Sequence, residues 1–228
     1  MQRLAAIFAH PDDETFATGG TIARYASEGT RCSLYCATDG DAGKSSGIPV
    51  SSRAELGALR RAELRAACDV LGISTLVSGG HPDGGLQDVK PDVVIGEIVA
   101  LVRRERPEVV ITFGPEGAPT RHRDHRAISR LATAAFLLAG LATEFPEQFA
   151  DGLTPHRPRE LWYSTWLVPA PGDNPPTQGQ PVDITLDVQA WLSQKRAAFD
   201  AHRTQHVHRA SFERLAIRDN EYYFVAIR

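Results

Sequence analysis

Short apolar runs that alternate with longer, helix-like stretches most restrict how this chain can fold. The apolar runs predict buried strands at Leu4–Phe8, Cys32–Ala37, Thr75–Val77 and Val109–Phe113. Helices are predicted between and after them, at Thr21–Ser27, Arg53–Leu71, Pro91–Arg104 and Leu131–Ala142. The Gly19-Gly20 pair reads as a turn before the first of these helices. Because strand and helix alternate, we expect an α/β, Rossmann-like fold with a mostly parallel sheet flanked by helices.

The pattern changes from about Asp151, where prolines interrupt it. Further strands are still predicted, at Leu161–Val168, Val182–Leu186 and Tyr222–Ile227, with a helix at Val188–His202. The proline-rich stretch Val168–Pro181 reads as a surface loop or flap, because patterned structure resumes directly after it. We therefore expect a single domain over residues 1–228, with an α/β core over 1–150 and a C-terminal extension over 151–228.

Charge and cysteine content restrict the partners and the compartment. The net charge of −3 predicts no general attraction to nucleic acid or to an anionic membrane. Leu131–Ala142 is the longest apolar stretch and is too short to span a bilayer, and Met1-Gln2-Arg3 leaves no room for a signal peptide before the first strand. Cys32, Cys36 and Cys68 lack metal-type pair spacing, which favours buried thiols in a reducing compartment. We expect a cytoplasmic protein, and pairing through the proline-rich flap would allow a homo-oligomer.

A cluster of ionisable residues, His10-Pro11-Asp12-Asp13-Glu14, follows the first predicted strand at once. Ligands bind at the carboxyl ends of strands in open α/β sheets. Ionisable side chains that are buried together need a partner, and a divalent cation is the simplest one. A histidine nitrogen together with carboxylate oxygens suits zinc better than magnesium or calcium. The alternative is a helix-capping turn, since Asp is favoured before a helix and Pro restricts a turn.

A second cluster, Arg121-His122-Arg123-Asp124-His125, lies past the strand Val109–Phe113 at the mouth of the next helix. A lone histidine there would more often be structural, but two histidines beside an aspartate favour a site. If the first and fourth strands are neighbours, both clusters face one crevice. His10, Asp13 and His125 then form a set of three ligands that leaves a fourth position for water, as in catalytic zinc sites.

The remaining members of the two clusters fit the other roles that hydrolysis of an amide requires. Asp12 could take the proton from the attacking water as general base. His122 could stabilise an oxyanion or protonate a leaving nitrogen. Asp124 could select the tautomer of His122 and hold the ring charged. Together these residues predict metal-assisted amide hydrolysis.

The two histidine-acid motifs resemble those of the PIG-L-type (LmbE-like) zinc N-deacetylases, which remove acetyl groups from N-acetylglucosaminyl conjugates and related sugars. Weaker similarities cover nearly the whole chain, at Asp39–Gly43, Arg60–Leu64, Pro82–Leu86, Pro155–Arg157 and Ala201–Gln205. The resemblance implies hydrolysis of an N-acetylated amino sugar or glycoconjugate, a small-molecule substrate. One departure is Arg123, which stands where the family usually has Pro and leaves the identity of the substrate open.

The same resemblance implies a role for each site residue. One zinc ion per chain would be held by His10, Asp13 and His125, and iron or cobalt can occupy such a set. Asp12 would be the base, and His122 with Asp124 the polarising pair. The residues expected to contact the sugar or acetate are Arg60, Asp83 and Arg157.

Two other functions use the same features and stay open at this point. One is hydrolysis of a different amide, or deamination, at the same metal centre. The other is a metal-bound sugar-binding module without turnover. Asp12 argues against this function, because it offers a general base in addition to the three metal ligands. Gly43-Lys44-Ser45-Ser46-Gly47 also matches a serine nucleophile elbow, but Ile48-Pro49 follows it instead of a helix. It is no P-loop, because Thr38 stands where that motif needs Gly.

Overall fold

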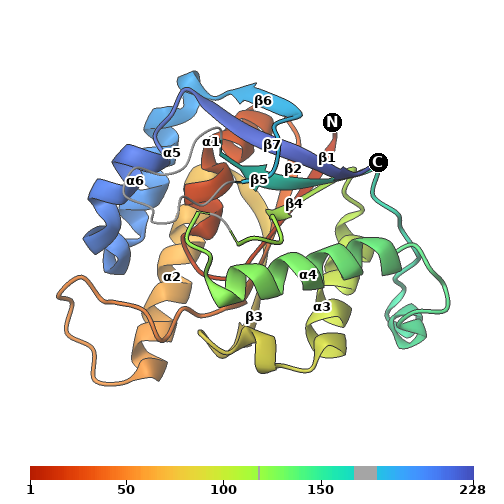
Figure 1. Ribbon diagram of the computed structural model, residues 1–228. Coiled ribbons are helices and arrows are strands. Elements are labelled where there is room, and N and C mark those ends of the chain that lie inside the picture. The colour runs from red at the N-terminus through yellow and green to blue at the C-terminus, as the bar shows by residue number, and fades with distance from the viewer. Residues whose placement is uncertain (118, 167–178) are drawn as a thin grey trace.

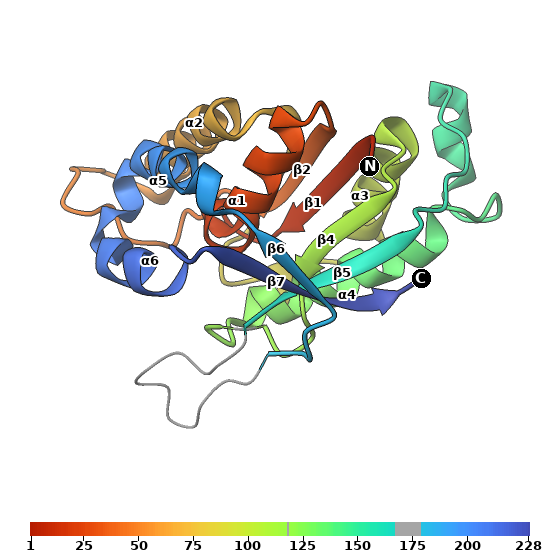
Figure 2. The ribbon, with the colours of Figure 1, turned by 90° about the horizontal axis from the view of Figure 1, so that it is seen from above.

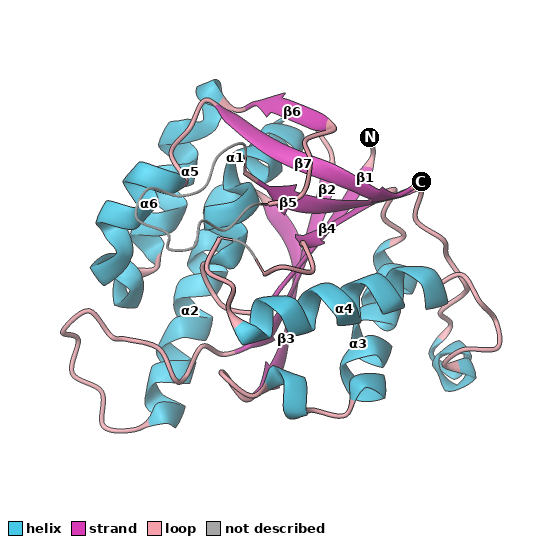
Figure 3. Cartoon of the chain, in the orientation of Figure 1, coloured by secondary structure: helices cyan, strands magenta, loops and turns pink. Residues whose placement is uncertain are grey.

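The computed structural model describes residues 1–117, 119–166 and 179–228. Within them the chain forms a seven-stranded sheet between helices (Figures 1 and 3). The strands are β1 (Arg3–Phe8), β2 (Arg31–Thr38), β3 (Ile73–His81), β4 (Val109–Phe113), β5 (Glu160–Thr165), β6 (Ile184–Asp187) and β7 (Asn220–Ile227). The α-helices are α1 (Asp13–Ser27), α2 (Arg53–Leu71), α3 (Pro91–Glu105), α4 (Arg123–Leu138), α5 (Leu192–Ala201) and α6 (Arg209–Leu215). Short 3₁₀ segments are η1 (Leu86–Asp88), η2 (Pro146–Asp151), η3 (Gln189–Trp191) and η4 (Arg203–His208).

The sheet is mostly parallel, with the strand order β3-β2-β1-β4-β5-β7-β6. β3, β2, β1, β4 and β5 pair in parallel, whereas β7 runs antiparallel to both β5 and β6. Helices α1, α2 and α5 lie on one face and α3 and α4 on the other (Figure 2). The prediction of an α/β fold with a mostly parallel, helix-flanked sheet, to which the C-terminal part adds strands and a helix, is confirmed.

The central position of β1 and β4 explains their apolar sequences. Helices cover both faces of the sheet here, so both sides of each strand must be apolar. Every residue of Leu4–Phe8 is at most 1% exposed. Leu4 pairs with Val109 in a parallel register, so the carboxyl ends of the two strands point to the same edge. The condition on which the predicted site depended, that these strands are neighbours, is met.

The turn predicted at Gly19-Gly20 was wrong, because α1 begins at Asp13 and runs through both glycines. The helix is kinked instead at Thr18, whose φ of −150° and ψ of 16° are not helical. A Cβ on Gly20 would lie 2.7 Å from the Cβ of Val188. Glycine at this position therefore allows α1 to approach the segment that precedes α5, which is a packing requirement and not a turn.

Several element boundaries also differ from the prediction. β3 extends to His81, well beyond Thr75–Val77, and α4 begins at Arg123 and ends at Leu138, before Ala142. Helix α6 was not predicted, and it depends on tertiary packing, since the ring of its Phe212 stacks on Phe199 with centroids 4.1 Å apart. The predicted loop Val168–Pro181 lies largely outside the described residues. Of the helices that the structure does describe, none has the length and hydropathy of a membrane span.

A buried arginine on α3 organises the chain after α4. Arg103 is 2% exposed, and its guanidinium donates to one side-chain oxygen and several main-chain oxygens. The acceptors are the carbonyls of Ala139, Leu141, Glu144 and Phe145 and Oε1 of Gln148, at 2.8–3.2 Å. These carbonyls belong to the end of α4 and to the segment that leads into η2, so Arg103 ties this segment to α3.

We expect Arg103→Met to lower the free energy of unfolding by about 3 kcal/mol, because it removes the hydrogen bonds of a buried guanidinium to four carbonyls and to Gln148. Chemical denaturation followed by circular dichroism measures this loss. The neighbouring Arg104 is exposed, so Arg104→Met is the matched control, with an expected change within about 0.5 kcal/mol. Equal losses in the two variants would contradict the organising role of Arg103.

Candidate metal centre

The turn between β1 and α1 brings His10, Asp12 and Asp13 to the carboxyl edge of the sheet. Asp12 has a φ of 112°, which a residue other than glycine rarely adopts. The amide of Asp12 donates to Oε2 of Glu14 at 3.0 Å, and its carbonyl accepts from the amide of Phe16 at 2.9 Å. A strained backbone that neighbouring groups hold in place is typical of functional sites.

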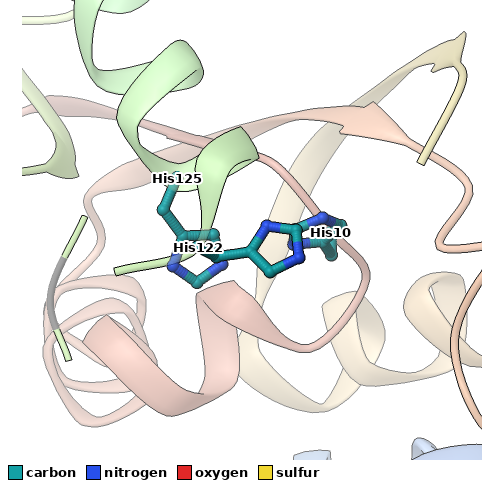
Figure 4. Close-up of side chains that lie close together, drawn as sticks. All are labelled: His10, His122 and His125. Carbon is teal, nitrogen blue, oxygen red and sulfur yellow. The ribbon is translucent and has the colours of Figure 1, made fainter. Parts of the chain in front are cut away.

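The start of α4 supplies the second cluster. His122 is the N-cap of this helix, and its Nδ1 accepts a hydrogen bond from the amide of Asp124 at 3.2 Å. His125 follows on the first turn of the helix, and its ring stacks on Phe113 at the end of β4, with centroids 4.1 Å apart. Figure 4 shows the rings of His10, His122 and His125 lying close together.

The three residues predicted as metal ligands meet through Asp13. Its Oδ2 lies 3.3 Å from Nδ1 of His10, and its Oδ1 lies 3.2 Å from Nε2 of His125. The three side chains are about 10% exposed or less. Two clusters that are more than a hundred residues apart in the sequence therefore form one site, as the sequence predicted.

The opposite nitrogen of His10 faces two further carboxylates. Its Nε2 lies 3.1 Å from Oδ1 of Asp83 and 3.3 Å from Oδ2 of Asp124. Asp124 is fully buried and also accepts from the amides of Gly84, at 2.7 Å, and Leu86, at 3.2 Å. Three carboxylates thus surround one imidazole, which concentrates negative charge at this edge of the sheet.

The ionisation of these groups follows from their burial and their neighbours. Burial raises the pKa of Asp12 to about 6, although the guanidinium of Arg60 opposes the shift. Burial alone would also raise the pKa of Asp13, but His125 and His10 lower it well below its usual range. For His10 burial acts downward, yet hydrogen bonds to the carboxylates around it raise its pKa well above 6.5.

The structure shows another contact between Asp124 and His122 than the expected one. The carboxylate of Asp124 contacts His10 and the main chain, and it is the amide of Asp124 that meets the ring of His122. Burial, followed by the nearby rings of His10 and His125, lowers the pKa of His122, although the carboxylate of Asp124 acts in the opposite direction. Since Nδ1 of His122 accepts a hydrogen bond, its neutral ring carries the proton on Nε2.

A cavity of about 400 Å³ opens beside the cluster. Its polar lining includes seven of the nine predicted site residues, all but Asp124 and Arg157, and its apolar lining comes from several elements. The lining residues are His10, Asp12, Asp13, Phe16, Ala17, Gly43, Arg60, Asp83, Phe113, Pro119, Thr120, His122, His125, Trp166, Gln205, His208, Ser211, Leu215 and Ala216. This size and this mixture of an apolar wall with a few polar groups are typical of small-molecule sites.

Arg60 and Asp83, predicted as substrate contacts, both line this cavity and also hold its framework. Arg60 on α2 donates to the carbonyls of Gly40 and Pro11. Asp83 accepts from the amide of Ala42 at 3.1 Å, besides its contact with His10. Both side chains therefore tie the loop after β2 to the metal-side cluster.

Arg157 is the predicted site residue that the structure does not bring to the cluster. It is exposed, and its Cβ lies against Gly140, after the end of α4. The neighbouring His156 contacts the carbonyl of Pro107, which precedes β4. Arg157 thus lies before β5, at the opposite edge of the parallel sheet from the cavity, and we leave it out of the proposed site.

The chemistry of the donor set fits a divalent transition metal. Among the described residues, two groups have donor atoms within 4.8 Å of one another, namely His10-His122-His125 and His10-Asp83-Asp124. The first shares both histidines with the predicted set, so Asp13 and His122 compete for the place of third ligand. Imidazole and carboxylate donors suit zinc, and a carboxylate behind a ligand histidine, as Asp124 is behind His10, is usual in such sites.

Two contacts at the site were not predicted. Glu14, inside the first motif, accepts from Nε2 of His202 at 2.8 Å, and both side chains are at most 1% exposed. Oγ1 of Thr120 lies 3.3 Å from Nδ1 of His125, on the side of the ring away from Asp13. The sequence marks Ala201–Gln205 only as a weak similarity to the family, and periodicity gives no signal for a contact across 188 residues.

Comparison with known proteins identifies the family. The model of the family described as "PIG-L: GlcNAc-PI de-N-acetylase" matches residues 5–136, more than half of the chain and both histidine-acid motifs. The chain belongs to the PIG-L family. The resemblance seen in the two motifs is therefore confirmed.

Several relatives of this member of the PIG-L family are sugar deacetylases. It is 32% identical to 1D-myo-inositol 2-acetamido-2-deoxy-alpha-D-glucopyranoside deacetylase of Rhodococcus opacus, over 90% of this chain and 82% of the relative. It is 30% identical to a probable N-acetyl-alpha-D-glucosaminyl L-malate deacetylase of Bacillus cereus, over 90% of this chain and 84% of the relative. The structure of N,N'-diacetylchitobiose deacetylase from Pyrococcus horikoshii superposes with a TM-score of 0.80 at 21% identity, over 99% of this chain and 84% of the other. That likeness shows the shared fold.

Proposed function

We propose that this chain is a zinc-dependent deacetylase that hydrolyses the acetamide of an N-acetylglucosamine conjugate. The observation that carries the proposal is the meeting of His10, Asp13 and His125 beside Asp12 and His122 in one cavity. Family membership and relatives that act on N-acetylglucosaminyl compounds support the substrate class.

His10, Asp13 and His125 would hold the ion. When bound, zinc lowers the pKa of a coordinated water toward neutrality and polarises a carbonyl oxygen. Asp124 holds His10 through its other nitrogen, and Thr120 lies against the outer nitrogen of His125. These outer contacts orient the two rings toward Asp13.

Asp12 is the proposed general base. Its side chain lines the cavity next to Asp13, and a carboxyl group with a pKa near 6 can both accept and return a proton near neutral pH. Asp12 would take a proton from the attacking water as its oxygen bonds to the acetyl carbon. It would return that proton to the sugar nitrogen as the C–N bond breaks, giving acetate and a free amine.

His122 is the proposed oxyanion donor. Because its Nδ1 is occupied by the amide of Asp124, the proton on Nε2 is free to reach the acetyl oxygen as negative charge develops. A neutral ring that donates from a fixed position needs no protonation event. Arg60 and Asp83 line the same cavity, and we propose that they contact hydroxyl groups of the sugar.

The decisive assay measures acetate and ammonia release from a small panel of substrates. The panel comprises N-acetylglucosamine, N,N'-diacetylchitobiose, and the inositol and malate conjugates of N-acetylglucosamine. We expect metal-dependent acetate release from at least one of them. Ammonia release would favour deamination, and binding without any product over a long incubation would favour a sugar-binding module.

The departure at Arg123 should not alter substrate recognition. Arg123 is the first residue of α4, where Pro is well tolerated, and its guanidinium lies 3.6 Å from Asp88, outside the cavity lining. We therefore expect Arg123→Pro to leave KM and kcat of the best substrate unchanged. Steady-state kinetics measures this, with Arg60→Met, inside the cavity, as the contrasting variant. A marked rise in KM for Arg123→Pro would show that Arg123 reaches the substrate.

We also propose a cytoplasmic location, because the three cysteines are free and buried and require no oxidising compartment. The proposed partner is a small N-acetylated sugar. A homo-oligomer stays a prediction that size-exclusion chromatography with light scattering can test.

A further inference from the structure

The contact between Glu14 and His202 links the C-terminal part of the chain to the proposed base. His202 follows directly after α5, which packs against α1 (Figure 2). Its Nε2 donates to Oε1 of Glu14 at 2.8 Å, and the ring is completely buried. Nδ1 of His202 is buried too and meets no hydrogen-bond partner among the described residues. Glu14 is therefore the contact that orients this ring.

The other oxygen of Glu14 holds the backbone of Asp12. Oε2 accepts from the amide of Asp12 at 3.0 Å, whereas Oε1 also accepts from the hydroxyl of Thr15. Asp12 is the residue with a φ of 112°, and such a conformation persists only where surrounding contacts enforce it. A chain of two hydrogen bonds thus runs from His202 through Glu14 to the strained residue of the turn.

We propose that His202 is a positioning residue, which acts through Glu14 to hold the Asp12 backbone and so aims the Asp12 carboxylate into the cavity. His202 does not line the cavity and is distinct from the residues that touch the substrate. A carboxylate without its partner could rotate within the turn and release the Asp12 amide. The inference rests on the proposed function in one respect, namely that Asp12 is the base.

The same segment offers a matched control. Two residues beyond His202, Thr204 donates through its amide and its hydroxyl to Glu63 on α2, at 2.9 and 2.6 Å. Thr204 thus anchors η4 to a buried carboxylate that has no contact with Asp12. Thr204→Val should destabilise this segment without moving the turn. It separates a general loss of packing from the positioning effect.

The test compares His202→Phe, which keeps the volume of a ring but removes the donor, with His202→Gln, whose amide can still donate to Glu14. We expect His202→Phe to lower kcat by about 100-fold, the usual cost of a small misplacement of a catalytic group. KM and the metal content should stay near those of the wild type. His202→Gln should recover most of the loss, and Thr204→Val should keep the wild-type kcat.

A second readout does not depend on turnover. Amide hydrogen exchange followed by nuclear magnetic resonance should be faster at Asp12 in His202→Phe, and unchanged in Thr204→Val. If His202→Phe does not fold, His202→Asn, which is too short to reach Glu14, takes its place with the same expectations. The proposal is overturned if kcat and Asp12 exchange stay at wild-type values, or if Thr204→Val loses as much kcat. A wild-type protein that releases no acetate refutes the proposed function, while the exchange comparison still decides whether His202 holds the turn.

Discussion

Asp12→Asn should leave the bound metal in place and lower kcat by about 10²–10⁴-fold, the usual contribution of a general base. Asparagine has nearly the shape of aspartate but cannot accept a proton at its amide nitrogen. The amide of residue 12 would still donate to Glu14, so the turn should keep its conformation. The measurements are kcat for acetate release and metal content by elemental analysis.

Asp39→Asn is the control for this variant. Asp39 lies at the end of the neighbouring strand β2 and pairs with Arg61, and it is not part of the cavity lining. Asp39→Asn removes a carboxylate from the same edge of the sheet but outside the cavity, so this substitution should change kcat little. If Asp12→Asn keeps nearly full activity, Asp12 is not the base, and the pKa of about 6 has no catalytic meaning.

Asp13→Asn should lose the metal, whereas His122→Asn should keep it. Removal of a direct ligand should lower zinc affinity by more than about 100-fold, the upper range for loss of an outer partner. His122 caps α4, and asparagine is also a favoured cap, so His122→Asn should fold normally. His122→Asn should instead lower kcat, because the oxyanion donor is missing.

Zinc titration into chelator-treated protein, with a competing indicator, measures both affinities. The two variants decide which residue is the third metal ligand. His122 is a candidate because its donor atom lies close to those of His10 and His125, and Asp13 is a candidate because it contacts both of these histidines. If His122→Asn loses zinc and Asp13→Asn retains it, His122 is the third metal ligand and Asp13 is not.

The sequence predicts those parts of this molecule whose structure depends on residues that are close together in the chain. Leu4–Phe8 and Val109–Phe113 are apolar on both sides because helices cover both faces, so they read as strands. The site at the ends of these strands follows from the rule that ligands bind at the carboxyl edge of a parallel sheet. The meeting of His10 and His125 was predicted for this reason.

The features that the sequence does not reveal depend on contacts between distant elements. Gly20 reads as a turn residue until Val188 is placed against it, and only then is its small size a packing requirement. His202 gives no signal of its own, because its role depends on Glu14 on another helix. For Arg157 the sequence suggests a site contact that the structure does not show. A resemblance in a short motif cannot specify at which edge of the sheet the residue lies.

The most direct test is an anomalous difference map at the zinc edge from crystals of the zinc-loaded protein. We predict one peak in the cavity, within about 2.0–2.2 Å of a nitrogen of His10, a nitrogen of His125 and an oxygen of Asp13. A peak held by His10, Asp83 and Asp124 with His125 out of reach, or no peak at this edge of the sheet, would contradict the proposed centre.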